Sequence, residues 1–140
     1  MKIYRTSIQI SADIERVWST LVNGLPADPH AFGIVRLEGT LAANGRIKLW
    51  SEVDPKRAFV LTVRTFDPPR KMVWQGGMPF GLFTGTRTFA LTGAGALITF
   101  DMQEVFGGAL SGLIVKTIPD LNASFEKFAQ ALKEKAENDG

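Results

Sequence analysis

The sequence predicts an α+β fold in which one curved antiparallel β-sheet packs against a long C-terminal α-helix. Apolar residues recur at every second position over about six consecutive segments between residues 34 and 106. Short turns between consecutive segments favour an antiparallel meander. After Pro119, the residues Leu121, Phe125 and Phe128 fall on one face of a helix of about 18 residues. This helix is the predicted element that is long enough to cover one face of the sheet.

The N-terminal segment predicts a strand, a helix and a loop, in that order. Residues 4–10 alternate loosely between polar and apolar types, which favours a strand. Ser11 is typical of a helix N-cap, and Asn23-Gly24 is expected to end the helix that follows. We expect residues 25–33 to form a loop with one short helical turn.

Turn-forming residues separate the predicted strands. Asn44-Gly45 is a strong turn dipeptide, and Asp54-Pro55 is expected to end the strand 47–53. The last hairpin is expected to turn at residues 93–95. An apolar loop rich in Gly and Pro is expected between residues 76 and 83. The predicted strands are 34–41, 47–53, 59–65, 70–75, 83–91 and 96–106. Residues 110–117 predict a short helix that Pro119 interrupts.

Length and composition bound the class of protein. The 140 residues suit one domain, 1–140, and 45% hydrophobic with 21% charged residues is typical of a globular chain. The absence of cysteine excludes disulfides, thiolate nucleophiles and Cys-ligated metals, and the single histidine excludes an all-histidine metal cage. We therefore expect no metal and no cofactor. A net charge of +2, with scattered Lys and Arg, does not indicate nucleic-acid binding.

The N-terminal decapeptide MKIYRTSIQI has no continuous apolar run, so we expect no signal peptide and a cytoplasmic location. The longest uncharged stretch, residues 72–86, is shorter than the roughly 18 apolar residues that a spanning helix needs. We therefore expect no stable insertion into a membrane.

Several motifs follow one another in an order that resembles a known superfamily. The matching segments are Ile10–Trp18 (ISADIERVW), Leu37-x-Gly39 with Gly45, Val73-Trp74, Gly85–Leu91, Glu104–Gly108 and Phe125–Lys133. Together they resemble the START-like, or birch-pollen-allergen-like (SRPBCC), superfamily. The chain is most similar to its small bacterial polyketide cyclase/dehydrase-like type.

This resemblance implies a helix-grip fold with a deep hydrophobic cavity between the sheet and the C-terminal helix. It implies binding of a lipid, a polyketide, an aromatic compound or another apolar molecule. It does not imply one particular reaction, because one fold hosts many functions.

Arg87 and Glu104 are the most informative pair of charged residues. By strand alternation, Arg87 shares a face with Phe89, and Glu104 shares a face with Met102 and Phe106. Both charges are therefore expected to point inward from neighbouring strands. Because a lone buried charge is costly, they should pair with each other, with a ligand or with water. Asp101 lies on the opposite face from Glu104, which makes a carboxylate dyad unsupported.

We predict that an apolar ligand lies between the sheet and the last helix, with Arg87 and Glu104 at its polar end. The predicted ligand-binding residues are Arg87, Glu104, Trp74, Phe89, Phe100, Met102, Phe106, Leu61, Val63 and Phe125. The same wall is expected to include Leu37, Leu49, Leu113, Leu121 and Phe128.

Other residues allow more than one interpretation. His30 is either a surface residue or a general base at the mouth of the cavity, since imidazole commonly titrates near neutral pH. The loop 77–83 is a lid, a dimer contact, a membrane-dipping tip or a cover for the edge of the core. Trp18 is expected to pack the first helix. Trp50 falls out of phase with Leu49, so it is either external or turned inward by a bulge.

The principal hypothesis for function is the binding of a small hydrophobic molecule without catalysis. A cofactor-independent cyclase or dehydratase that uses Arg87, Glu104 or His30 for proton transfer is the enzyme alternative. An interaction protein similar to a chaperone cofactor is the third hypothesis, and a homodimer is compatible with each. An open cavity with convergent polar groups favours the first two, whereas a filled core favours the third.

Overall fold

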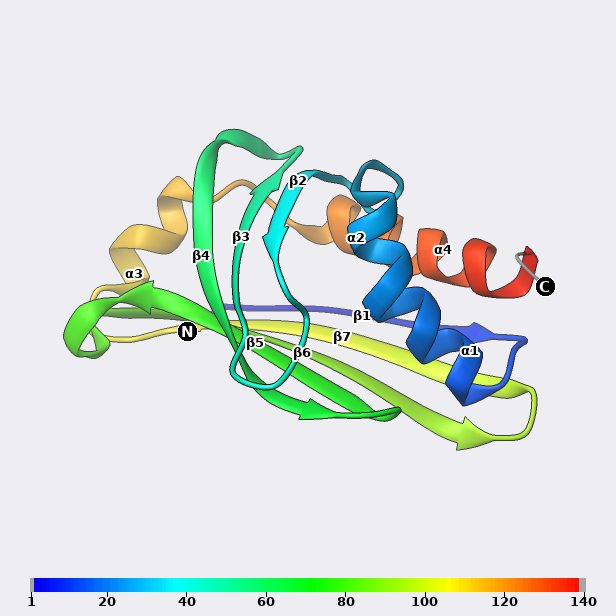
Figure 1. Cartoon of the computed structure of the whole chain (residues 1–140). Coiled ribbons are helices and arrows are strands. Elements are labelled where there is room, and N and C mark those ends of the chain that lie inside the picture. Colours follow the sequence, from blue (N-terminus) through cyan, green and yellow to red (C-terminus); the bar gives the residue numbers. More distant parts are fainter. Residues whose placement is uncertain (1, 139–140) are drawn as a thin grey trace.

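The computed structural model describes residues 2–138 and contains one seven-stranded antiparallel sheet with a long C-terminal helix. The strand order is β1-β7-β6-β5-β4-β3-β2, so the meander from β2 to β7 is completed by β1 at one edge (Figure 1). This confirms the predicted fold class. The strands are β1 (Lys2–Ile10), β2 (Ile34–Gly39), β3 (Arg46–Ser51), β4 (Asp54–Asp67), β5 (Lys71–Met78), β6 (Phe83–Ala94) and β7 (Leu97–Gly107).

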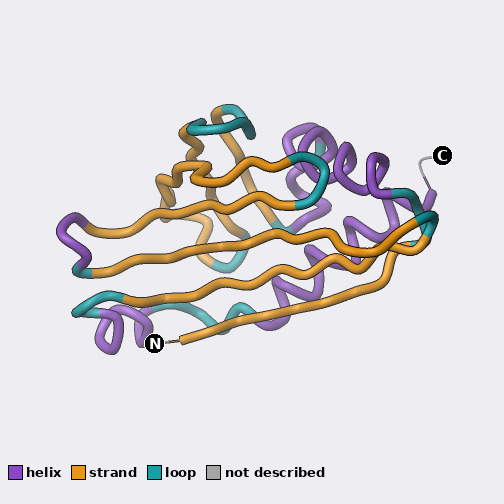
Figure 2. Tube along the Cα trace, turned by 90° about the horizontal axis from the view of Figure 1, so that it is seen from below, coloured by secondary structure: helices purple, strands orange, loops and turns teal. Residues whose placement is uncertain are grey.

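The helices α1, α2 and α4 lie on one side of the sheet, whereas η3 is the tip of the β5–β6 hairpin (Figures 1 and 2). The longest is α4, whose length agrees with the predicted C-terminal helix. The segments are α1 (Ile14–Ser19), η1 (Thr20–Gly24), α2 (Leu25–Ala27), η2 (Pro29–Phe32), η3 (Pro79–Gly81), α3 (Ser111–Ile114), η4 (Val115–Thr117) and α4 (Asn122–Asn138).

The sheet is strongly curved. Strands β1, β7, β6 and β5 form a floor, from which β4 bends so that β3 and β2 rise beside α4 (Figure 1). The pairing of β4 with β5 is irregular between Val63 and Thr65, and that of β3 with β4 between Leu49 and Ser51. Bulges of this kind bend a strand and increase its twist, so they account for the curvature that leaves space on the concave face of the sheet.

The first helix differs from the prediction at both ends. Asp13, not Ser11, is the N-cap, and its side chain accepts a hydrogen bond from the backbone N–H of Arg16. At the other end the chain continues through Gly24 as a π-helical turn into α2. Leu25 is completely buried there, so tertiary packing outweighs the weak helix propensity of Gly24.

Strands β4 and β5 extend into segments that were predicted to be a break and a loop. β4 begins at Asp54, and Pro55 does not break it because neither β3 nor β5 has a register partner for Pro55. β5 continues to Met78, which pairs with Phe83, so most of the predicted loop 76–83 belongs to a hairpin. The connection that remains carries Phe80, which is 98% exposed at the tip.

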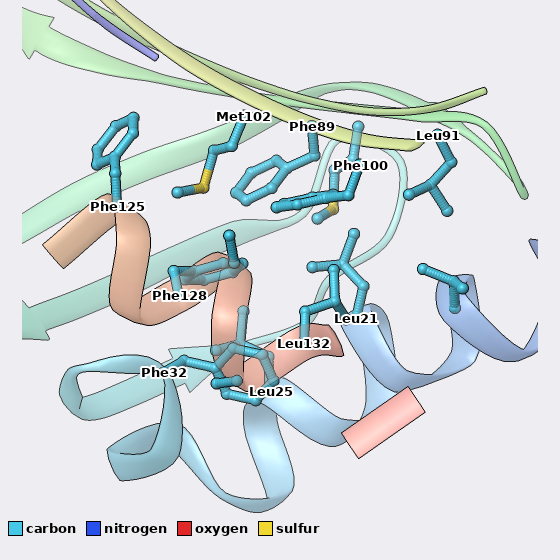
Figure 3. Packing of buried hydrophobic residues seen from close by; sticks show 14 of the residues in the cluster. Leu21, Leu25, Phe32, Phe89, Leu91, Phe100, Met102, Phe125, Phe128 and Leu132 are labelled. Atoms are coloured by element: carbon cyan, nitrogen blue, oxygen red, sulfur yellow. The ribbon is translucent and has the colours of Figure 1, made fainter. Parts of the chain in front are cut away.

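Aromatic side chains fill the core between α4 and the floor of the sheet. The ring centroid of Phe128 lies 6.1 Å from that of Phe100 and 5.8 Å from that of Phe89. On its other side, the centroid of Phe32 lies 5.0 Å from Phe128, and Figure 3 shows Phe32 and Leu25 below the helix. This cluster fixes one half of α4 against the sheet.

Polar contacts hold α4 to the surrounding elements. Lys127 Nζ donates a hydrogen bond of 2.8 Å to Glu52 Oε2 in the β3–β4 turn. Lys135 Nζ lies 3.1 Å from Asp28 Oδ2, and this hydrogen bond lowers the pKa of the Asp28 carboxyl. Between Lys2 and Asn138, no helix is long and apolar enough to cross a membrane.

Candidate functional site

A cavity of about 450 Å³ lies between the concave face of the sheet and the N-terminal half of α4. Pockets that bind drug-sized molecules commonly measure about 300–1,000 Å³, so this one is large enough for a ligand. Its lining is mainly apolar and comes from the end of η2, from strands β2 to β7, from the segment before α4 and from α4 itself. Phe128 of α4, which stacks on Phe100 of β7, closes one end of the cavity.

The structure brings most of the predicted ligand-binding residues together around this cavity. Those that line it are Arg87, Glu104, Trp74, Met102, Phe106, Leu61 and Phe125. Phe89, Phe100 and Val63 do not line it and instead pack within the core beyond the end of the cavity. Alternation places all three on the correct face of the sheet, but it carries no information about position along the strand.

The rest of the predicted wall divides in the same way. Leu49, Leu121 and Phe128 line the cavity, whereas Leu37 packs against the core elsewhere. Leu113 was expected in the wall and is instead 67% exposed on α3. The prediction for Leu113 is wrong because the segment between β7 and α4 folds as two short helical turns outside the cavity.

Arg87 and Glu104 form an ion pair on the floor of the cavity. They are direct cross-strand partners in β6 and β7, and Arg87 Nε donates a hydrogen bond of 2.9 Å to Glu104 Oε1. Their side chains are 19% and 10% exposed. The Arg87 guanidinium also lies over the ring of Phe125 from α4, with 4.8 Å between its central carbon and the ring centroid. The predicted inward-facing pair is therefore confirmed.

The guanidinium of Arg87 has hydrogen-bonding capacity left over. Within residues 2–138, its bond from Nε to Glu104 is the one hydrogen bond that the Arg87 side chain makes. Its two terminal amino groups remain as donors beside an apolar cavity.

Trp74 lies next to Arg87 across the β5–β6 pair. Its ring packs on Phe89 with 4.6 Å between centroids, at 61°. The indole N–H is enclosed and has no acceptor among the described residues. Because no water-sized space reaches this nitrogen, Trp74 contributes an apolar ring face to the cavity.

The mouth of the cavity lies at the ends of several elements. Arg57 and Ala58 of β4, Met78 of β5 and Pro119 before α4 line the cavity and are themselves exposed. Arg57 pairs with Asp54 at 3.2 Å, which adds a second charged pair at the rim. Sequence reasoning missed this rim, because it treated Asp54-Pro55 as a break.

Several glycines are also among the lining residues that sequence reasoning missed. Gly76, Gly77 and Gly85 line the cavity from within strands. A glycine inside a strand weakens it, and it often marks a close approach of backbone or ligand. That signal was present in the sequence and could have indicated the site.

The remaining candidates lie away from the cavity. His30 is exposed in η2 and does not line the cavity, so the structure gives no support to a general base at its mouth. Trp18 belongs to α1 and packs that helix against Phe66 of β4, as predicted. Trp50 stacks with Arg36 and does not line the cavity. Within residues 2–138, no three His, Asp or Glu side chains gather in a way that could hold a metal ion.

Comparisons with known proteins agree with this architecture. A family model described as polyketide cyclase/dehydrase and lipid transport matches residues 1–137. No curated protein matches the sequence.

Solved structures with the same fold have very different sequences. Protein MLL2253 from Mesorhizobium loti shares 15% identity over 95% of both chains, with a TM-score of 0.71. Truncated norcoclaurine synthase from Thalictrum flavum shares 12% identity over 98% of this chain and 94% of that chain, with a TM-score of 0.67. The Aha1 dimer from Colwellia psychrerythraea shares 16% identity over 99% of this chain and 98% of that chain, with a TM-score of 0.71. These similarities show the fold alone.

Proposed function

The chain belongs to the polyketide cyclase/dehydrase and lipid transport family, and we propose that it binds a small hydrophobic molecule in the cavity between the sheet and α4. The family match agrees with the START-like resemblance of the sequence. The observation that carries the proposal is an apolar cavity of about 450 Å³ with one charged pair, Arg87 and Glu104, on its floor. Apolar walls supply binding energy, and a few convergent polar groups fix orientation.

Arg87 is the residue we propose as the polar anchor. It projects into the cavity between Trp74 and Glu104, which are its direct partners on the two neighbouring strands. A partly buried side chain with unused N–H donors forms a strong hydrogen bond with a ligand acceptor, because few water molecules compete for those donors. The ligand is therefore expected to place a polar group near Arg87 and its apolar body among Leu61, Phe106 and Phe125.

A second candidate function is catalysis of a cyclisation or dehydration. The observation that favours it is Glu104, a carboxylate inside the cavity where a bound substrate would lie. A carboxylate can transfer protons to and from a substrate, and the family description includes cyclases and dehydrases. His30 has no role in this proposed catalysis, since it does not line the cavity.

The third candidate, an interaction protein without a ligand, is less well supported because the core is not filled. A homodimer remains compatible with each candidate. One protein of similar fold is described as a dimer, and in this chain the exposed Phe80 at the β5–β6 tip is an available contact.

The test is native mass spectrometry of the protein purified from its own host. We expect a mass increase from a co-purified apolar molecule, and we expect that increase to fall in an Arg87→Ala variant that remains folded. The matched control is Arg64→Ala on strand β4 of the same sheet, because Arg64 is exposed and does not line the cavity. A ligand-free spectrum, together with no binding of a hydrophobic fluorescent probe, would contradict the proposal.

A further inference from the structure

The two most exposed large apolar side chains among residues 2–138, Phe80 and Leu113, lie at the same end of the molecule. Phe80 is in η3, at the tip of the β5–β6 hairpin, and Leu113 is in α3. Figure 1 shows these two elements beside each other, at the end of the sheet where β1 begins. We call the surface formed by η3 and α3 the apolar end. Neither of the two side chains lines the cavity.

Backbone hydrogen bonds join the two elements of the apolar end. The N–H of Leu110, just before α3, donates a bond of 2.7 Å to the carbonyl oxygen of Leu82, and the N–H of Ala109 donates one of 3.3 Å to that of Gly81. Gly108 approaches the tip so closely that a Cβ atom on it would lie 2.7 Å from the Gly81 oxygen. The hairpin tip and α3 are therefore fixed to each other and present their apolar side chains together.

The backbone of Phe80 has a conformation that packing within the chain does not explain. Its φ of 60° and ψ of 25° lie in the left-handed region, which is unusual for a bulky side chain. The ring gains no burial from this conformation, because the side chain is almost completely exposed. Unfavourable backbone conformations cluster at functional contacts, so this ring is a candidate for contact with a partner outside the chain.

The segments that build the apolar end carry no acidic residue. Residues 68–100 and 105–119 contain neither Asp nor Glu. The one charged residue in the second segment is Lys116, which is exposed and follows α3. Lys2 is also exposed and lies at the same end of the sheet, because it pairs with Phe106 near the end of β7. Positive charge therefore accompanies the exposed apolar side chains.

The nearest carboxylates along the chain and at the mouth of the cavity have partners within the protein. Asp120 Oδ1 accepts a hydrogen bond of 2.9 Å from the backbone N–H of Asn122, at the start of α4. Asp54 pairs with Arg57 at the rim. These acids therefore leave the positive charge of Lys116 and Lys2 without a counter-ion at the apolar end, and an external anion can supply one.

We propose that the apolar end docks on the surface of an anionic phospholipid bilayer, with the Phe80 ring among the acyl chains and Lys116 near the lipid phosphates. Peripheral binding commonly combines apolar side chains that enter the interface with basic residues that attract anionic lipids. No element of the chain has to cross the bilayer. The inference is independent of any ligand in the cavity, because Phe80, Leu113 and Lys116 do not line it.

A lipid surface fits the apolar end better than a second copy of the chain does. A two-fold contact through this end would bring the Lys116 side chains of the two copies toward each other, which is unfavourable. Stable protein interfaces also bury about 800 Å² on each partner, and a hairpin tip with one projecting ring offers little flat area. Lipid chains, in contrast, rearrange around a projecting ring, and their head groups supply negative charge.

The test is flotation of the protein with two kinds of vesicle, made of phosphatidylcholine alone or of phosphatidylcholine mixed with phosphatidylglycerol. We expect the wild type to bind the mixed vesicles more strongly than the neutral ones. Phe80→Gly should weaken binding to the mixed vesicles by about tenfold, because it removes the ring that enters the lipid. Its melting temperature should not fall below that of the wild type, because glycine adopts a φ of 60° without strain.

Leu97→Ala is the matched control for Phe80→Gly, because Leu97 is exposed at the start of β7, at the opposite end of the sheet. It should leave binding to both vesicles unchanged. Lys116→Gln should weaken binding to the mixed vesicles by about fivefold and should not change binding to the neutral ones. Its matched control is Lys71→Gln, since Lys71 is exposed at the start of β5, away from the hairpin tip.

Binding of wild type and Phe80→Gly to the same extent overturns the proposal, and so does the absence of binding to either vesicle. Sedimentation in the absence of lipid tests for a protein partner. A wild-type dimer that Phe80→Gly converts to a monomer would mean that a second copy covers the apolar end, and it would overturn docking on lipid. Each of these results leaves the proposed function intact, because native mass spectrometry tests the cavity separately.

Discussion

Arg87 and Glu104 face each other across β6 and β7 and join through a hydrogen bond of 2.9 Å from Arg87 Nε to Glu104 Oε1. The pair lies at the boundary between the packed core and the cavity. Each side chain therefore neutralises the charge of the other, and the terminal amino groups of Arg87 are still available to a ligand. The consequences of breaking the pair differ for stability and for binding.

Removing Arg87 alone should destabilise the protein. Arg87→Ala leaves the Glu104 carboxylate, whose side chain is 10% exposed, without its cation. We expect a loss of about 3 kcal/mol in the free energy of unfolding, measured by urea denaturation. The double variant Arg87→Met with Glu104→Gln should recover most of this loss, because no unpaired charge remains. If Arg87→Ala were as stable as the wild type, water in the cavity would be solvating Glu104, and the pair would have no structural role.

The inward direction of these two residues was predictable from two-residue periodicity, but their register was not. A turn centred on residue 94, as expected, would place Arg87 opposite Asp101, whereas the hairpin turns at residues 95–96 and places Arg87 opposite Glu104. The same reasoning does not say where along a strand the core ends and the cavity begins. Phe89 and Phe100 were therefore expected to contact a ligand and are instead packed against Phe128.

The aromatic cluster around Phe128 should contribute much more to the free energy of unfolding than the exposed helix α3. Phe128→Ala removes a ring that contacts Phe32, Phe89 and Phe100, and we expect it to cost about 3–5 kcal/mol. Leu113→Ala, at a position that is 67% exposed, should cost less than about 0.5 kcal/mol. Thermal and urea denaturation of both variants provide the measurement. A large effect at Leu113 would mean that α3 covers apolar surface in solution.

The tryptophans should report on occupancy of the cavity. A brominated decanol quenches indole fluorescence by contact, and Trp74 is the tryptophan that lines the cavity. We expect saturable quenching that Trp74→Phe removes and that Trp50→Phe preserves, since Trp50 stacks with Arg36 outside the cavity. Quenching that survives Trp74→Phe would place the probe elsewhere on the protein.

Contacts between distant segments were beyond reach of the sequence, because they depend on how the closing helix is placed. Ser11 was expected to cap the first helix. Instead its backbone N–H donates a hydrogen bond of 2.7 Å to Oε2 of Glu137, near the end of α4. Lys133 Nζ joins the same site, and it donates to both Glu137 Oε2 at 2.6 Å and the carbonyl oxygen of Gln9 at 2.9 Å. These bonds fasten α4 to the end of β1.

This fastening should make stability depend on pH through Glu137. The hydrogen bond from Lys133, and after it the one from the Ser11 backbone, lower the pKa of the Glu137 carboxyl below its ordinary value of 4.5. A group whose pKa is lower in the folded state stabilises the fold fully above its unfolded pKa. That contribution is lost as the pH falls through the folded pKa. Urea denaturation of the wild type and of Glu137→Gln at a series of pH values measures it.

We expect Glu137→Gln to be less stable than the wild type at neutral pH, and the difference to shrink as the pH falls below 4.5. Glu134→Gln is the matched control on the same helix, because Glu134 accepts its hydrogen bond from Gln130 and has no cation as partner among the described residues. Its difference from the wild type should show no such trend. A Glu137→Gln difference that stays constant from neutral to acid pH would mean that the amide keeps the contact with Ser11, and that the carboxylate charge contributes nothing.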